Sequence, residues 1–204
     1  MPDNSMVKNI LLTGHPGVGK TTMLKGIIER FAHLAMTGFY TEEIREKGIR
    51  LGFKAVTMNG SSAVFAHRNF QTGPEHRVGR YGVNPEVLET LVLAHLSPQG
   101  QAAHLVIVDE IAKMELLSMP FREGLLQALD SDCPLLGTIS LKGTGFIKQV
   151  KRRDDVELFK ITTENRNVLG EQVCRRLQQI LGETGPADRR PQTTNRKRGL
   201  RTED

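Results

Sequence analysis

The sequence is poor in aromatic residues and in cysteine. Its 204 residues contain no tryptophan, and aromatic residues make up only 5% of the chain. The two cysteines, Cys133 and Cys174, lie far apart and in no CxxC or Cys/His grouping. These features argue against a small disulfide-stapled fold and against a zinc site. We expect both thiols to be reduced members of a hydrophobic core.

Long hydrophobic runs are also missing. No apolar run approaches the roughly 18 residues that a membrane-spanning helix requires. The first residues lack the basic segment that opens a secretory signal. With 38% hydrophobic and 25% charged residues, the composition is that of an ordinary globular domain. We therefore expect a cytoplasmic protein without membrane contact, and we also expect a monomer.

Excess positive charge is confined to one end of the chain. Residues 187–201 hold six basic side chains against the single Asp188, which equals the whole net charge of +5. Residues 183–204 offer one large apolar side chain, Leu200, so burial cannot offset the entropy of ordering them. We predict one domain over residues 1–182 and a disordered basic tail over 183–204. The tail is either a solvated terminus or a weak contact for RNA or another anionic surface.

Strand and helix patterns alternate through the predicted domain. Residues 9–13 form a short apolar run, and apolar residues from Leu24 to Ala35 then recur at the spacing of one helix face. Between Phe39 and about His67 the pattern changes to strands separated by turn dipeptides. Further strands are predicted at 105–108, 135–139 and 156–161, and helices from Asn84 onward, over 118–129 and over 165–181.

Residues 14–21 (GHPGVGKT) match the phosphate-binding loop pattern GxxxxGK[ST] in full. The match lies between a predicted strand and a predicted helix. There, glycines let backbone N–H groups curve around phosphate oxygens, and the helix N-terminus adds the positive end of its dipole. We expect Lys20 to reach the β- and γ-phosphates and Thr21 to bind Mg²⁺. The predicted nucleotide-binding residues of the loop are Gly14, His15, Pro16, Gly17, Val18, Gly19, Lys20, Thr21 and Thr22.

The loop and the order of the elements together predict the fold. We expect an α/β fold, a three-layer α/β/α P-loop NTPase with a mostly parallel central sheet. A β-hairpin or meander is inserted after the first helix.

A P-loop needs a second acid at the end of a nearby strand to support the Mg²⁺ ion. Asp109 directly follows the apolar strand at 105–108 and is predicted to serve this purpose. Glu110 comes next, at the sheet edge where open α/β sheets bind their ligands. There it could activate a water molecule for attack on the γ-phosphate. The alternative is an acid that stabilises a helix N-terminus.

Several segments beyond the P-loop carry a family resemblance. They are Gly38–Glu43 (GFYTEE), Arg50–Phe53 (RLGF), Val78–Tyr81 (VGRY), Val108–Leu116 (VDEIAKMEL) and Glu164–Asn167 (ENRN). With the P-loop, they resemble the cancer-related nucleoside-triphosphatase family, small P-loop enzymes first described from thermophiles. The resemblance covers roughly residues 8–182. One departure is Ala112, where the family pattern usually has glycine.

The resemblance implies hydrolysis of ATP, GTP and other nucleoside triphosphates to the diphosphate and phosphate, with Mg²⁺ and loose base selectivity. The sequence contains no NKxD-like reader of guanine. Arg166, before the last helix, offers a planar guanidinium that could stack on any base. Its alternative is an exposed arginine beside a helix cap at Asn165.

Transition-state charge on the γ-phosphoryl group requires a cation besides Lys20. The candidates, each alternatively part of a solvated face, are Arg50, Arg80, Lys148, Lys151, Arg152 and Arg153. Lys113 and Glu115 could pair with each other, contact phosphate or form a solvated pair near a helix start.

Hydrolysis is the predicted activity, with Glu110 and Lys20 as catalytic residues, because the acid beside Asp109 favours water activation. Two other functions stay open. One is a P-loop kinase that transfers the γ-phosphate to an unidentified acceptor, and the other is a nucleotide-dependent switch linked to RNA through the tail.

Overall fold

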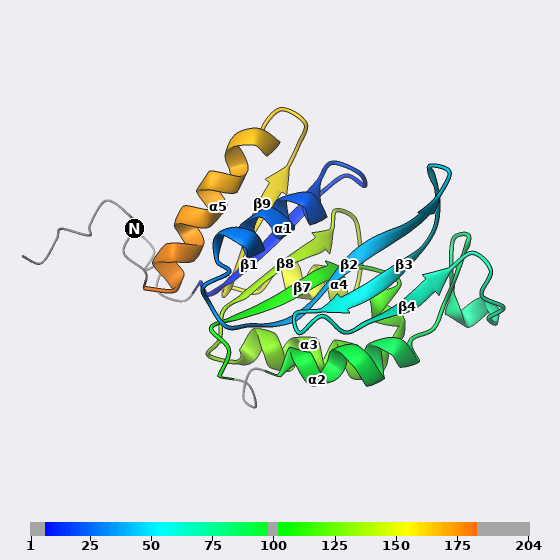
Figure 1. Cartoon of the computed structure of the whole chain (residues 1–204). Helices are drawn as coiled ribbons and strands as arrows, with labels where there is room; N and C mark the ends of the chain where they lie inside the picture. Colours follow the sequence, from blue (N-terminus) through cyan, green and yellow to red (C-terminus); the bar gives the residue numbers. More distant parts are fainter. Residues whose placement is uncertain (1–6, 98–101, 183–204) are drawn as a thin grey trace, which may run out of the picture.

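One nine-stranded sheet runs through the molecule (Figure 1). The computed structural model describes residues 7–97 and 102–182. The strand order is β5-β6-β4-β3-β2-β7-β8-β1-β9. The strands are β1 (Asn9–Gly14), β2 (Met36–Glu46), β3 (Ile49–Thr57), β4 (Ser62–His67), β5 (Arg77–Val78), β6 (Tyr81–Val83), β7 (Leu105–Ile111), β8 (Leu135–Ser140) and β9 (Val156–Ile161).

The strands β2, β7, β8, β1 and β9 form the parallel half of the sheet. Gly14 at the end of β1 pairs with Ser140 at the end of β8 and with Ile161 at the end of β9. The carboxyl ends of the central strands therefore meet at one edge. In open α/β sheets this is the edge that binds ligands.

The inserted strands extend the same sheet beyond β2. β3, β4, β6 and β5 follow one another in antiparallel pairs. β2 and β3 are joined at Lys47 and Gly48, which both have positive φ angles of 47° and 80°. Two such residues are typical of a tight type I′ hairpin turn. The insertion is thus a meander, and the complete sheet is mixed, with a parallel and an antiparallel half.

Helices cover both faces of the sheet, as expected for three layers (Figure 1). α1 (Lys20–Arg30) and α5 (Arg166–Ile180) lie on one face, while α2 (Leu93–Leu96) and α3 (Met119–Asp130) lie on the other. The short α4 (Phe146–Lys151) adds Ile147 and Val150 to the core under α3. Apolar burial on both faces fixes the sheet between the helix layers.

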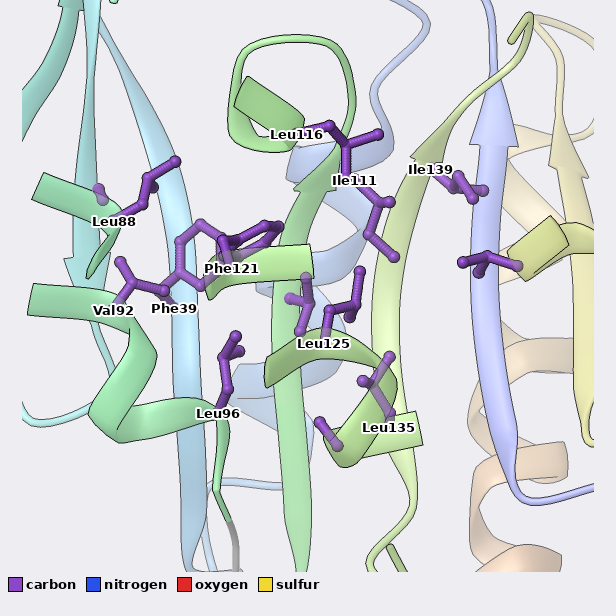
Figure 2. Close-up of a cluster of buried hydrophobic side chains, with 14 of the residues drawn as sticks. Phe39, Leu88, Val92, Leu96, Ile111, Leu116, Phe121, Leu125, Leu135 and Ile139 are labelled. Atoms are coloured by element: carbon purple, nitrogen blue, oxygen red, sulfur yellow. The ribbon is translucent and has the colours of Figure 1, made fainter. Parts of the chain in front are cut away.

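The larger hydrophobic core lies under α2 and α3 (Figure 2). Phe39 of β2 meets Phe121 of α3 edge to face, with ring centroids 5.9 Å apart and planes at 80°. Leu88, Leu96 and Leu125 surround this pair and are fully buried. This packing fixes β2, from which the inserted strands begin, against the helices that cover the parallel strands.

Some predicted element boundaries are wrong. α1 ends at Arg30, so Ala35 is an exposed residue of the connection to β2. After Asn84, the segment Leu88–Val92 is π-helical and precedes α2, a difference that apolar spacing does not reveal. α4 was not predicted because its six residues are too short for a periodic signal.

Cys133 and Cys174 are free thiols, half-buried and buried respectively, as expected. Within residues 7–97 and 102–182, no helix is long and apolar enough to cross a membrane. The predicted tail, residues 183–204, lies outside the described residues.

Candidate active site

The phosphate-binding loop connects β1 to α1. Gly17 and Gly19 have φ angles of 77° and 106°, which residues other than glycine rarely adopt. A Cβ atom at either position would meet no atom within 4 Å, so the space in front of the loop is open. At Gly14, in contrast, a Cβ atom would lie 2.7 Å from the carbonyl oxygen of Ile161. Gly17 and Gly19 thus allow the backbone conformation of the loop, and Gly14 allows β1 to lie close to β9.

The residues predicted from the motif lie together in this loop and in the first turn of α1. His15, Pro16 and Gly17 are exposed, whereas Val18 is buried in the core beneath α1. The N–H of Val18 donates to the carbonyl oxygen of His15 over 3.2 Å, which closes the loop. Thr22 is exposed on the first turn of α1.

Asp109 lies in β7 with no exposed surface. Its carboxylate accepts hydrogen bonds from the hydroxyls of Thr21 at 3.0 Å, Thr41 at 3.1 Å and Thr138 at 2.6 Å. The backbone N–H of Thr41 also donates to it, over 3.3 Å. These four donors compensate for the burial of the carboxylate and fix it toward the first turn of α1.

The two residues predicted to bind Mg²⁺, Thr21 and Asp109, are therefore adjacent. Hydroxyl and carboxylate oxygens are the hard ligands that Mg²⁺ takes from proteins, with water and phosphate oxygens completing its octahedron. The residues present fit this ion. Thr41 and Thr138 were missed by sequence reasoning. They flank Asp109 on the neighbouring strands β2 and β8, so aligning the predicted parallel strands could have found Thr138.

Glu110 forms an ion pair with the P-loop lysine, Lys20. Its Oε1 is 3.3 Å from Nζ of Lys20, with 32% of the Glu110 side chain and 10% of the Lys20 side chain exposed. Burial raises the pKa of Glu110 above its ordinary value, and the charge of Lys20 opposes this shift. β7 continues to Ile111 beyond it. The alternative interpretation of Glu110 as a helix N-terminal acid is therefore wrong.

Glu115 lies in a short 3-10 turn, Glu115–Leu117, and only 4% of its surface is exposed. Its Oε2 has no hydrogen-bond partner among the described residues. Burial raises its pKa well above the ordinary value, and the charge of Glu110 adds to the shift. The interpretation of Glu115 as part of a solvated pair is wrong, whereas Lys113 is exposed.

A cleft of about 1210 Å³ opens in front of the loop, and we call it the central cleft. Its walls come from α1, β2, β3, the segment that follows β7 and the end of β8. The residues that line it include Pro16, Lys20, Thr21, Thr22, Lys25, Thr41, Glu42, Glu43, Arg45, Arg50, Phe53, Val78, Glu110, Lys113, Glu115, Ser140 and Lys142.

A second hollow of about 570 Å³ lies between α1 and α5, and we call it the α1–α5 groove. Arg166, exposed at the start of α5, lines it together with Gly19 and Thr22 of the P-loop region. The Asn165 side chain does not cap α5. It accepts from the N–H of Thr162 at 2.8 Å and donates to the carbonyl oxygen of Lys160 at 2.9 Å, so it shapes the preceding turn.

Among the cations predicted to neutralise transition-state charge, Arg50 alone lines the central cleft. Arg153 instead pairs with Asp130 at 2.6 Å and with Asp155 at 2.8 Å. Lys151 donates to the carbonyl oxygen of Ser140 at 2.6 Å. Arg80, Lys148 and Arg152 also lie outside the lining of the cleft.

The mixed sheet, the loop between β1 and α1, and the buried acid on β7 define a P-loop nucleoside-triphosphatase. A family model described as NTPase matches residues 9–174. Nucleoside-triphosphatase THEP1 from Thermotoga sp. (strain RQ2) is 40% identical over 174 residues, which are 85% of this chain and 98% of the relative. The Homo sapiens cancer-related nucleoside-triphosphatase is 36% identical over 177 residues, with 80% and 93% covered.

Solved structures agree with the sequence relatives. The crystal structure of THEP1 from the hyperthermophile Aquifex aeolicus has a TM-score of 0.75 and 34% identity, over 83% of this chain and 99% of that one. The solution structure of a human cancer-related nucleoside triphosphatase has a TM-score of 0.73 and 34% identity, over 85% and 98%. The chain belongs to this nucleoside-triphosphatase family, which confirms the resemblance, and it is an enzyme of that class.

Proposed function

We propose that the protein hydrolyses Mg-bound nucleoside triphosphates to the diphosphate and phosphate, with water activated by Glu110. The observation that carries the proposal is the ion pair between Glu110 and Lys20 in the lining of the central cleft, with Oε1 and Nζ 3.3 Å apart. The open loop and the Thr21–Asp109 contact complete the arrangement. Phosphoryl transfer depends on positioning and on charge stabilisation more than on covalent chemistry with the protein.

The P-loop holds the triphosphate in this proposal. Backbone N–H groups between Gly14 and Thr22 surround the β-phosphate, and Lys20 contacts the β- and γ-phosphate oxygens. Thr21 and Asp109 hold the Mg²⁺ ion. When bound, Mg²⁺ offsets charge on the β- and γ-phosphate oxygens.

Glu110 accepts a proton from the attacking water. The water oxygen bonds to the γ-phosphorus while the bond from that phosphorus to the β–γ bridging oxygen breaks. The diphosphate leaves with the bridging oxygen, and the proton resides on the Glu110 carboxylate. A partly buried carboxylate with a raised pKa is a stronger base than an exposed one, which suits this role.

The nucleobase lies in the α1–α5 groove, whose lining includes Arg166 and does not include Glu110. Arg166 stacks its guanidinium on the face of the base. Stacking uses no base-specific hydrogen bond, so ATP, GTP and other nucleoside triphosphates are all accepted. The names of the family members, which specify a nucleoside-triphosphatase without a base, are consistent with this expectation.

Phosphate release in the absence of any acceptor tests the proposal. With Mg-ATP and then Mg-GTP, we expect equal amounts of diphosphate and phosphate, and no turnover after Mg²⁺ is chelated. The same assay with added nucleosides or RNA 5′ ends tests the kinase alternative. If the γ-phosphate were transferred to an acceptor and no free phosphate were released, the protein would be a phosphotransferase and not a hydrolase. Nucleotide binding with neither reaction would favour the RNA-linked switch.

A further inference from the structure

Three motifs that carry the family resemblance lie outside the P-loop, and only Thr41 among their residues hydrogen-bonds to the metal-site residue Asp109. They are GFYTEE at 38–43, RLGF at 50–53 and VGRY at 78–81. In the fold they meet at one wall of the central cleft, which is lined from β2, β3 and β5, and Tyr81 of β6 is buried behind it. Phe53 packs against Tyr81 with ring centroids 5.4 Å apart and planes at 66°.

Arg50 is the charged centre of this wall. Its Nη1 donates to Oε1 of Glu43 over 2.6 Å, and its Nε donates to the hydroxyl of Tyr81 over 3.1 Å. Its guanidinium carbon lies 5.0 Å from the ring centroid of Phe53. One carboxylate, one hydroxyl and one aromatic ring thus hold the guanidinium in this structure.

The wall is continuous with the phosphate site. Thr41 of β2 bonds to Asp109, and Glu43 follows two residues later on the same strand, about 7 Å further along at the usual rise per residue. Arg50, Lys20 and Glu110 line the same cleft. A γ-phosphate held by the P-loop would project into this cleft, whose lining Arg50 shares with Lys20.

We propose that Arg50 is the arginine that neutralises the γ-phosphoryl group during hydrolysis, supplied from within the chain by the inserted meander. This inference rests on the proposed hydrolysis. Before nucleotide binds, Glu43 holds the Arg50 guanidinium. When a triphosphate occupies the loop, the guanidinium exchanges the Glu43 carboxylate for γ-phosphate oxygens, and Tyr81 and Phe53 keep the rest of the side chain in place.

Moving the Arg50 guanidinium from Glu43 to phosphate is favourable because Glu43 is paired with both Arg45 and Arg50. Its Oε2 also accepts from Nε of Arg45 over 2.7 Å, so Glu43 keeps one cation when Arg50 leaves. A terminal phosphate presents more charge and a planar guanidinium binds it through two hydrogen bonds. As the bond to the bridging oxygen breaks, its electron pair passes to that oxygen. A guanidinium on the γ-phosphoryl group and within reach of the leaving oxygen therefore interacts more strongly in the transition state.

Two other cations of the cleft, Arg45 and Lys25, are held by other partners. Arg45 is 53% exposed against 35% for Arg50, and it also donates to the carbonyl oxygen of Gly48 in the hairpin turn. Lys25 is held by Glu42 at 2.9 Å and lies over the ring of Tyr40. A cation that is shielded from water stabilises developing charge more strongly.

Arg50→Ala and Arg80→Ala form a matched pair for the test. Arg80 donates to the same Tyr81 hydroxyl, over 3.2 Å, but is exposed and lies outside the lining of the cleft. Single-turnover hydrolysis of Mg-ATP, the Kd of Mg-ATP and the trapping of ADP with aluminium fluoride are measured for both. We expect Arg50→Ala to lower the rate on the order of 10²–10³-fold, to change Kd by a few-fold at most and to abolish trapping. Arg80→Ala should resemble the wild type in all three.

Other results of these measurements would contradict either the proposed hydrolysis or the role of Arg50. If wild-type protein neither hydrolyses ATP nor traps aluminium fluoride, the proposed hydrolysis fails. If the wild type does both and Arg50→Ala does them equally well, the role of Arg50 alone is overturned. A loss of ATP affinity as large as the loss of rate would also overturn it, because it would indicate ground-state binding. If Arg50→Ala does not fold, Arg50→Lys replaces it in the test, because lysine keeps the charge but lacks the planar guanidinium. The proposal then requires that Arg50→Lys lower the single-turnover rate while the Kd of Mg-ATP is unchanged.

Discussion

Asp109 and Glu110 are neighbours in the sequence, yet their side chains have different surroundings. Asp109 has no exposed surface and accepts hydrogen bonds from three threonine hydroxyls. Glu110 is one-third exposed, faces the cleft and has Lys20 as its charged partner. A carboxylate that is fixed by several donors suits a metal ligand, whereas one that faces open space suits proton transfer.

Glu110→Gln should lower kcat on the order of 10²-fold or more, because the amide cannot accept a proton from water. The amide keeps the size of the side chain, and the loss of a negative charge near the triphosphate should leave nucleotide affinity equal or tighter. Single-turnover hydrolysis and nucleotide titration measure the two quantities separately. Hydrolysis at the wild-type rate would assign water activation to another residue.

Asp109→Asn is the comparison for that variant. A metal ligand acts in the ground state and in the transition state alike, so Mg²⁺-dependent binding and turnover should fall together. If Asp109→Asn instead kept full nucleotide affinity, the assigned roles of the two acids would need to be exchanged.

Glu115→Gln should stabilise the nucleotide-free protein at alkaline pH. The folded-state pKa of Glu115 is raised by burial and then by the charge of Glu110, so its stabilising contribution is complete below the unfolded pKa and is lost as pH rises through the folded pKa. The glutamine has no charge to lose. We expect a difference in unfolding free energy of about 1–3 kcal/mol at pH 8, which shrinks toward pH 5. Urea unfolding across this range measures it, and a difference independent of pH would contradict the prediction.

At the scale of elements, local patterns predicted the phosphate side of the site. The strand at 9–13, the loop and the helix that begins at Lys20 are consecutive, so spacing along the chain was sufficient to predict the place of Thr21. Asp109 was predicted separately, from its position directly after the apolar strand at 105–108. The wall around Arg50 could not be predicted in this way. The contacts of Arg50 join Glu43, Phe53 and Tyr81, which lie on different strands. The register of these strands depends on how the whole sheet packs, and a short stretch of sequence does not reveal it.

The pairing of β2 with β7 depends on Gly38. Its φ is 100°, and a Cβ atom there would lie 2.0 Å from the carbonyl oxygen of Ile107. Gly38→Ala should therefore destabilise the protein on the order of 3 kcal/mol or more. Gly26→Ala in α1 is the control, since a Cβ there meets nothing within 4 Å and should stabilise the helix by about 0.5–1 kcal/mol. Equal urea midpoints for Gly38→Ala and the wild type would show that the strand adapts.

At the scale of the whole molecule, the P-loop and α1 line two hollows, and Gly17, Gly19, Thr22 and Gly26 belong to both linings. The central cleft gathers charged side chains around the predicted γ-phosphate position, while the α1–α5 groove presents Arg166 beside small and apolar residues and the Arg30–Glu171 ion pair. The residues proposed for catalysis, Glu110 and Lys20, thus line the cleft alone, and the residue proposed to contact the base, Arg166, lines the groove alone. Changes in the groove can alter base preference without moving Glu110 or Lys20.

Removal of residues 183–204 should leave both hydrolysis and folding unchanged. α5 ends at Ile180, within the described residues, and the deleted sequence contains one large apolar residue, Leu200. With so little apolar surface to bury, its loss should shift Tm by no more than about 2 °C. Tm and ATP turnover at low and high salt are compared for the full and shortened chains, together with binding of both to single-stranded RNA. RNA binding by the full chain alone would identify the tail as an anion contact. A fall in Tm of several degrees, or a large loss of turnover at low salt, would instead show that the tail docks on the domain or on the substrate.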